Sequence, residues 1–200
     1  MLYEWPAVLD EGDKEQILRI INAVAATQGT NGIPRPLTPD EGAAYMDAVA
    51  ASVARGDSYQ LCARRECDGS IVAIATVEPV KLNPARRHVV EIKRMAAGPD
   101  ARGFGAYLID GWGVILDKCR ELGCDVINID VSEDGPYRLW QKLGFRVWAR
   151  VPDYARAGGR RLDGYFLSVY VDEAYAALER FRRAAQRAAA GAGTDMRLSP

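Results

Sequence analysis

The segment "GPDARGFGAYLID", residues 98–110, contains Gly103 and Gly105 beside Arg102, directly before an apolar pattern with helical spacing. Small residues before a helix allow backbone N–H groups to point at an anion. The segment lacks the lysine of the Walker phosphate loop, and Leu108 stands where a dinucleotide-binding loop has its third glycine. It is therefore either a short loop that holds a pyrophosphate on backbone amides or a tight turn that the two glycines shape.

Two carboxylates, Glu91 in "VVEIKRM" and Asp130 in "VINIDVS", lie within otherwise apolar strand patterns. Removing a carboxylate from water is costly, so its presence in such a strand needs a reason. One reason is chemical, because either side chain could accept a proton as a general base. The structural alternatives are that Glu91 pairs with Lys93 or Arg94 and that Asp130 caps the following turn.

Hydrophobic spacing and turn residues predict the elements that position these groups. Helices are predicted over 10–29, 38–55, 103–123, 135–144 and 173–190, and strands over 3–8, 59–65, 71–80, 88–97, 125–131, 145–151 and 162–172. The helix after Thr38 starts with a capping box, with Pro39 at its first position and Glu41 at its third. The order predicts a mixed α/β fold with a largely antiparallel sheet, and it places the glycine turn after a strand end, where open sheets bind ligands.

Composition excludes several classes of function. The chain has 200 residues, with 26 basic and 27 acidic side chains, so no strong positive field attracts nucleic acid. The start of the sequence lacks the pattern of a signal peptide, and no apolar run reaches the roughly 18 residues that span a bilayer. Four cysteines and one histidine, without tight knuckle spacing, predict no metal site. We expect a cytoplasmic protein with no membrane or nucleic-acid partner.

The segments "EIKRMAAGPDARGFGAYLID" and "LWQKLGF" together resemble the GCN5-related N-acetyltransferases (GNAT family) over about residues 5–172. The resemblance implies a six- to seven-stranded, mostly antiparallel sheet flanked by helices, with a splayed central strand pair. It also implies acetyl-CoA as co-substrate, and one acetyltransferase domain over 1–172. A terminal helix and a disordered tail are expected over 173–200.

The resemblance also implies which residues lie at the cofactor. A backbone N–H near Met95 or Ala97 would polarise the thioester carbonyl, and loop amides would hold the diphosphate. The residues expected at the cofactor are Met95, Ala96, Ala97, Arg102, Gly103, Phe104, Gly105, Ala106, Tyr107, Asp134 and Trp140.

Two features depart from the family pattern. The pyrophosphate loop fits in two registers, one that uses Arg102 and Gly105 and one that uses Gly103 and Gly105. Trp140 stands where many members have a tyrosine that protonates the leaving thiolate, and an indole N–H is too weak an acid for that step. Tyr137 is therefore a candidate replacement acid, with ordinary packing as its alternative, and Trp140 is expected against the pantetheine arm or in the core.

Within the family, Glu91, Asp130 and "PDYA" resemble the branch that contains the tabtoxin resistance acetyltransferase. Antibiotic- and toxin-modifying enzymes are frequent there, and acids near the site suit a small polycation. We therefore expect acetylation of an aminoglycoside-type amine, such as a kasugamycin-like amino sugar. The alternatives are a protein or peptide N-acetyltransferase and a non-catalytic acyl-CoA sensor. The apolar strand "YFLSVYV", taken as an exposed sheet edge, predicts a homodimer.

Overall fold

The computed structural model describes residues 1–27, 32–99, 101, 104–132 and 137–195, with side chains outside 104–108 and 188–195. The strands are β1 (Leu2–Glu4), β2 (Tyr59–Arg64), β3 (Ile71–Pro79), β4 (Val89–Ala97), β5 (Val126–Ser132), β6 (Arg146–Ala157) and β7 (Arg160–Tyr170). The helices are α1 (Glu11–Thr27), α2 (Pro39–Ala54), the 3₁₀ turn η1 (Pro84–Arg86), α3 (Phe104–Glu121), α4 (Tyr137–Lys142) and α5 (Val171–Asp195).

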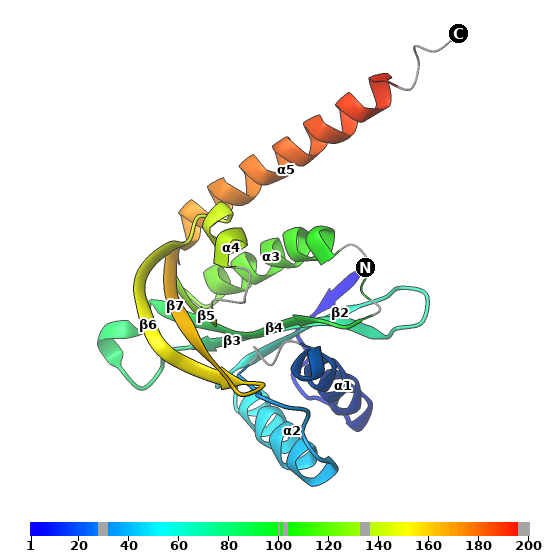
Figure 1. The fold of residues 1–200 in the computed structure, drawn as a ribbon, viewed down its shortest axis with the longest axis vertical. Helices are drawn as coiled ribbons and strands as arrows, with labels where there is room; N and C mark the ends of the chain where they lie inside the picture. The colour runs from blue at the N-terminus through cyan, green and yellow to red at the C-terminus, as the bar shows by residue number, and fades with distance from the viewer. Residues whose placement is uncertain (28–31, 100, 102–103, 133–136, 196–200) are drawn as a thin grey trace.

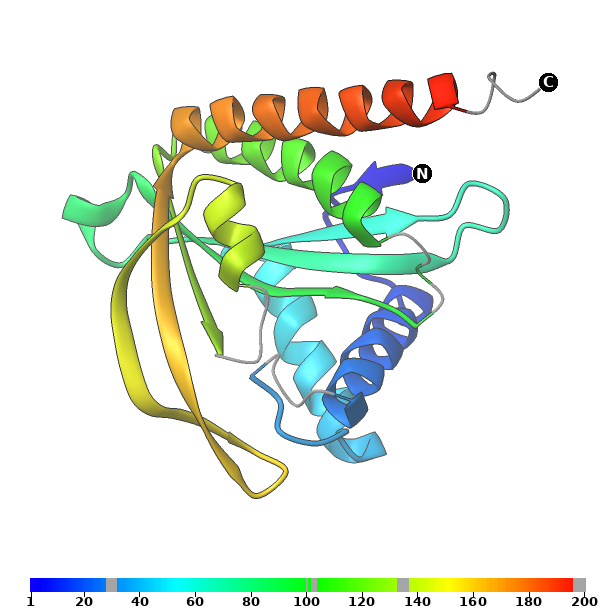
Figure 2. The same ribbon diagram turned by 45° about the horizontal axis from the view of Figure 1, so that its top comes forward.

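The strands form one seven-stranded sheet in the order β1-β2-β3-β4-β5-β7-β6. Only β4 and β5 are parallel to each other within this sheet, as the helix crossover between them requires. Helices α1 and α2 cover one face, and α3, with α5 lying along it, covers the other (Figures 1 and 2). The mixed fold and the mostly antiparallel sheet predicted from the sequence are confirmed.

Each face of the sheet has its own apolar core. On the α3 face, Trp112, Ile115 and Leu116 are fully buried against side chains of the central strands. On the other face, Ile17, Ile20 and Ile21 of α1 form the centre of a second cluster. These residues recur at helical spacing, so each helix buries one stripe and exposes the opposite side.

Helix α2 begins as its sequence predicts. The Thr38 side chain accepts from the Glu41 backbone N–H, and the Glu41 carboxylate accepts from the Thr38 backbone N–H, which confirms the capping box. The Arg35 guanidinium also binds both oxygens of Glu41. The hydrogen bond from Arg35, followed by those from Thr38, lowers the pKa of Glu41 to about 2.

Two expectations about the end of the chain need correction. The strand "YFLSVYV" is not a sheet edge, because β7 lies between β5 and β6. The outer strand is β6, and it carries the exposed side chains Val147, Trp148 and Val151. In addition, helix α5 continues to Asp195, into the segment predicted as a disordered tail; residues 196–200 lie outside the described part of the chain.

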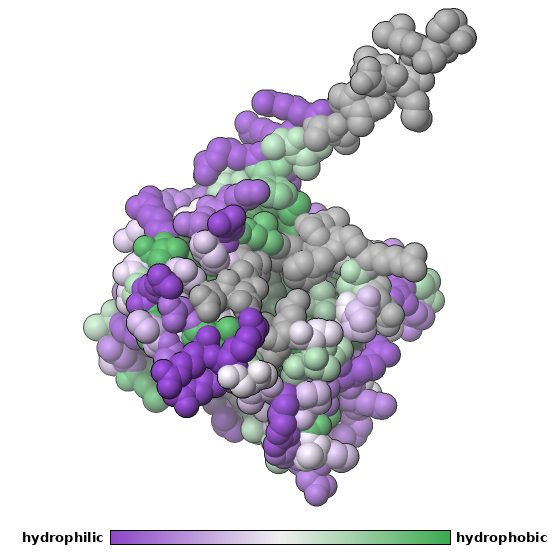
Figure 3. Space-filling model, viewed as in Figure 1, coloured by the Kyte–Doolittle hydropathy of each residue, from purple (hydrophilic) through white to green (hydrophobic). Residues whose placement is uncertain are grey.

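Much of the face shown in Figure 3 is hydrophilic. Hydrophilic side chains gather on the hairpin of β6 and β7 and on the described part of α5, and apolar surface occurs in smaller patches (Figure 3). In the described chain, no helix has the length and apolar character needed to cross a membrane.

Candidate functional site

The central strands β4 and β5 separate along their length. Their parallel register comprises Val89 with Val126, Val90 with Ile127, and Glu91 with Asn128. Strand β4 continues to Ala97 and β5 to Ser132, but no further pairing between the two strands occurs among the described residues. The sheet therefore opens toward the carboxyl ends of β4 and β5, which is the predicted splay.

A β-bulge interrupts β4 at the point where the strands separate. Thr76 of β3 lies opposite Lys93, but Ile74 lies opposite Ala96, so Arg94 and Met95 together face Ala75. Arg94 has a φ of 53°, in the left-handed region. That conformation costs a non-glycine residue roughly 1–2 kcal/mol, so neighbouring contacts must stabilise the bulge.

The extra residue reverses the direction of the backbone groups beyond it. Before the bulge, the carbonyl of Val89 accepts from Val80, so alternate residues of β4 direct their backbone groups to β3. After the bulge, the N–H of Gly98 donates to Val72 of β3. Successive residues of a strand direct their backbone groups to opposite sides, and Met95 and Ala97 lie three residues and one residue before Gly98. Their N–H groups therefore point away from β3, to the open edge that faces β5. The family resemblance implied a donor to the thioester carbonyl at one of these two positions.

Helix α3 starts close to the end of β4. The N–H of Ala101 donates to the carbonyl of Gly98 in a turn, and α3 begins at Phe104. The backbone N–H groups of Phe104, Gly105 and Ala106 lie in the first turn of α3, where N–H groups lack intrahelical acceptors. The predicted anion site therefore has its amides at a helix N-terminus. Arg102, Gly103 and Asp134 lie outside the described residues, so the register of the loop stays open.

The two candidate carboxylates lie on the same face of the sheet, opposite to the α3 core. Glu91 is aligned with Asn128 of β5, and Asp130 follows two residues later on the same strand. The Glu91 carboxylate lies 3.3 Å from Lys93 Nζ, and its side chain is 38% exposed. The alternative that Glu91 pairs with Lys93 is therefore observed, and the carboxylate still reaches solvent.

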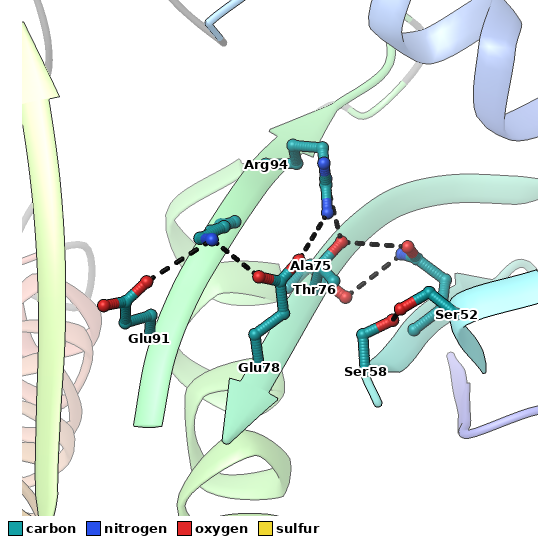
Figure 4. Close-up of polar contacts among 9 residues, drawn as sticks. Ser52, Ser58, Ala75, Thr76, Glu78, Glu91 and Arg94 are labelled. Atoms are coloured by element: carbon teal, nitrogen blue, oxygen red, sulfur yellow. Dashed lines mark hydrogen bonds and ion pairs between the residues drawn. The ribbon is translucent and has the colours of Figure 1, made fainter. Parts of the chain in front are cut away.

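A charged cluster beside Glu91 was not anticipated. Glu78 of β3 accepts from Lys93 Nζ at 2.6 Å and from Arg94 Nη2 at 2.9 Å (Figure 4). Burial acts to lower the pKa of Lys93, but the hydrogen bond to Glu78 and the charges of Glu78 and Glu91 outweigh it, so that pKa is raised. Glu78 could have been found from the alternation of "IVAIATVEP", which places Thr76 and Glu78 on one face.

Asp130 has a partner from the hairpin of β6 and β7. The Tyr154 hydroxyl donates to Asp130 Oδ2. Burial, followed by this hydrogen bond, raises the pKa of Tyr154 above its usual value. Tyr154 packs directly over Gly164, where a Cβ would lie 2.2 Å from the ring. The quoted run "PDYA" contains Tyr154, but its contact with Asp130 depends on the pairing of β7 with both β5 and β6.

The aromatic residues of α4 differ in their surroundings. Trp140 is 5% exposed and packs edge-on against Trp112 and Phe145, so it lies in the core, one of its two predicted places. Tyr137, the first residue of α4, stacks on Tyr165 of β7 with ring centroids 4.6 Å apart. The Tyr137 hydroxyl accepts from Arg138 Nε at 3.4 Å. Tyr137 is thus the α4 residue that carries a hydroxyl.

Each of the two apolar cores contains a buried cysteine thiol. Cys62 and Cys119 are fully buried, and burial raises the pKa of each thiol to about 12. In the part of the chain that the structure describes, no three histidine, cysteine or acidic side chains lie together in a way that could hold a metal ion. A surface hollow of about 380 Å³ lies elsewhere, near Val80 and Arg87 at the opposite end of β4.

Comparisons with known proteins identify the fold. No family model and no curated protein matches the chain. Solved structures do match, among them a ribosomal-protein-alanine N-acetyltransferase from Brucella melitensis, with a TM-score of 0.68, 21% identity and coverage of 85% of this chain and 99% of that one. An N-acetyltransferase from Staphylococcus aureus matches with a TM-score of 0.66, 19% identity and coverage of 85% and 98%.

A third solved structure contains the co-substrate. It is a GNAT-superfamily phosphinothricin acetyltransferase from Sinorhizobium meliloti in complex with acetyl-CoA, with a TM-score of 0.68, 19% identity and coverage of 84% of this chain and 87% of that one. At these identities the similarity concerns the fold, including its order of strands and helices. The chain therefore has the fold of the GNAT acetyltransferases.

Proposed function

We propose that the chain is an acetyl-CoA-dependent N-acetyltransferase that acts on a primary amine. The observation that carries this proposal is the opening between β4 and β5, whose β4 edge presents the N–H groups of Met95 and Ala97 beside the start of α3. An open strand edge next to unpaired helix amides fits an elongated ligand with a carbonyl at one end and a diphosphate further along.

Bound acetyl-CoA would supply an acetyl group on a good leaving thiolate. The first-turn amides of α3, from Phe104 to Ala106, would hold the diphosphate. The N–H groups of Met95 and Ala97 would stabilise negative charge on the carbonyl oxygen. Such donors contribute about 10²–10³-fold to a rate when they are already oriented.

Side chains around the opening would carry out the two proton transfers, from the amine and to the leaving thiolate. An amine with a pKa of about 8–10 is mostly charged at neutral pH, so a base must remove a proton before attack. Glu91 is our first candidate because it is solvent-accessible and lies on the strand that carries the N–H donors. Asp130 is the second candidate, although its bond to Tyr154 already occupies one oxygen. Tyr137 is the candidate acid for the thiolate.

The acceptor that we propose is a small cationic amine of the aminoglycoside type. Its support is the group of acids Glu78, Glu91 and Asp130 on one face of the sheet, close to the opening. Lys93 and Arg94 offset two of these charges, so the excess of negative charge is small. An incoming ammonium group could replace Lys93 beside Glu91, because Lys93 keeps its shorter contact with Glu78.

Thiol release from acetyl-CoA over a panel of amines tests this proposal. The panel holds aminoglycosides, amino sugars, free amino acids and peptides with a free N-terminus, with a reaction lacking amine as control. Turnover with aminoglycosides supports the proposed substrate. Turnover only with peptides would instead support the alternative, a protein or peptide N-acetyltransferase. Binding of CoA without any turnover would contradict enzymatic function and favour an acyl-CoA sensor.

A further inference from the structure

Two polar side chains are buried beneath the bulge of β4. Thr76 of β3 is fully buried and Gln60 of β2 is 2% exposed, and both lie on the face of the sheet that α1 and α2 cover. Buried polar groups are destabilising unless they are hydrogen-bonded, so their partners indicate what they stabilise.

Their hydrogen bonds lead from β2 to the bulge. Gln60 Nε2 donates to the carbonyl of Ala75, the residue opposite the bulge, at 3.0 Å. Thr76 Oγ1 donates to Gln60 Oε1 at 3.0 Å and accepts from Arg94 Nε at 3.4 Å. The left-handed residue Arg94 is thus tied through Thr76 to Gln60 (Figure 4).

Glu78, on the same face of β3 as Thr76, also holds the bulge. Its two oxygens bind Lys93 and Arg94, which are neighbours in the sequence and would point to opposite faces in a regular strand. Only the bulge allows both cations to reach one carboxylate. A regular register would direct Arg94 toward the apolar α3 core, so the Glu78 contacts favour the bulged register over a one-residue slip.

We propose that Gln60, Thr76 and Glu78 act as a clamp that fixes the β4 bulge and thereby aims the N–H groups of Met95 and Ala97 into the opening between β4 and β5. The three are positioning residues, since they act through the backbone of β4. This inference rests on the proposed acetyl transfer for its kinetic consequence, while the clamp itself is a property of the unliganded fold.

Thr76→Val is the main test, because it keeps the shape of the side chain and removes the hydroxyl. We expect kcat with acetyl-CoA and the fastest amine of the panel to fall by about 10- to 100-fold, since misplacement of a donor by about 1 Å can cost about 10²-fold. The KM for acetyl-CoA should stay within about twofold, because the diphosphate site on α3 is unchanged. Thr76→Ser restores the hydroxyl and should recover most of kcat.

Ser58→Ala is the matched control. Ser58 is buried on the same face, and its hydroxyl donates to Ser52 at 2.8 Å without contacting β4 (Figure 4). It should leave kcat unchanged. If Thr76→Val does not fold, Glu78→Gln provides the second variant, since it weakens both bonds to the bulge from a partly exposed position. It should lower kcat in the same way.

Hydrogen exchange of residues 92–98 in the free protein separates the clamp from the proposed function. We expect faster exchange in Thr76→Val than in the wild type and in Ser58→Ala. If the wild type shows no turnover with any amine, the proposed function fails and the exchange result still decides on the clamp. Unchanged exchange in this segment, or a loss of kcat in Ser58→Ala equal to that in Thr76→Val, would overturn the inference.

Discussion

Replacing Glu91 by glutamine separates catalysis from stability more sharply than any other change at the site. Glu91→Gln keeps the shape of the side chain and removes its basicity. If Glu91 accepts the proton of the amine, kcat/KM should fall by about 10²–10⁴-fold, which corresponds to about 2.7–5.4 kcal/mol of transition-state stabilisation.

The expected cost in folding stability is much smaller. The ion pair with Lys93 is 3.3 Å long between side chains that are 38% and 39% exposed. Pairs of this kind contribute about 0–1 kcal/mol, and Lys93 retains Glu78 at 2.6 Å. The free energy of unfolding in urea should therefore change by less than about 1 kcal/mol while the activity falls by orders of magnitude.

Thiol release measured across pH provides the assay, and Asp130→Asn is the matched control. In Glu91→Gln the acidic limb of the pH–rate profile should disappear, whereas Asp130→Asn should retain it. A kcat/KM within about threefold of the wild type would refute the assignment of Glu91 as base. A loss confined to KM would instead make Glu91 an anchor for a cationic substrate.

Four further changes test other parts of the molecule. Gly105→Val should weaken CoA binding in calorimetry by crowding the first turn of α3; unchanged affinity in a folded variant would reject the diphosphate site. Gly164→Ala should displace Tyr154 from Asp130, because a Cβ would lie 2.2 Å from the ring, and should alter tyrosine fluorescence and lower the melting temperature. Glu41→Gln should reduce the loss of stability between about pH 4.5 and 2: the folded-state pKa of Glu41 is lowered, so its contribution is present above that range and lost as pH falls through it. Trp148→Glu, at a side chain 62% exposed on the outer strand, should convert a dimer to a monomer in light scattering, and a monomeric wild type would contradict the predicted dimer.

The features that could be predicted from the sequence depend on short-range interactions. The capping box of α2 joins Thr38 to Glu41, three residues apart, so their types and spacing suffice to predict it. The strand–turn–helix from β4 into α3 follows from an apolar strand, two glycines and a helical repeat. Such local patterns determined the order of the elements and, with the family resemblance, the expected fold.

The orientation of the site residues could not be predicted in the same way. Which backbone groups of β4 face β3 depends on one extra residue. Nothing in "VVEIKRMAA" marks Arg94 as that residue, since an arginine is an unfavourable choice for a left-handed conformation. Its stabilising partners, Thr76 and Glu78, come from β3. Likewise, Tyr154 meets Asp130 only because β7 pairs with both β5 and β6.

The sequence by itself determined which groups are available: a small-residue turn before a helix, and acids within apolar strands. Tertiary structure decided which of them act together, because strand pairing brings residues from distant parts of the chain to neighbouring positions. It paired Glu78 with Lys93 and Arg94, placed β6 rather than β7 at the sheet edge, and turned the N–H groups of Met95 and Ala97 toward the opening. Backbone direction alternates along a strand, so a single bulged residue held by side chains of other strands determines where those donors point.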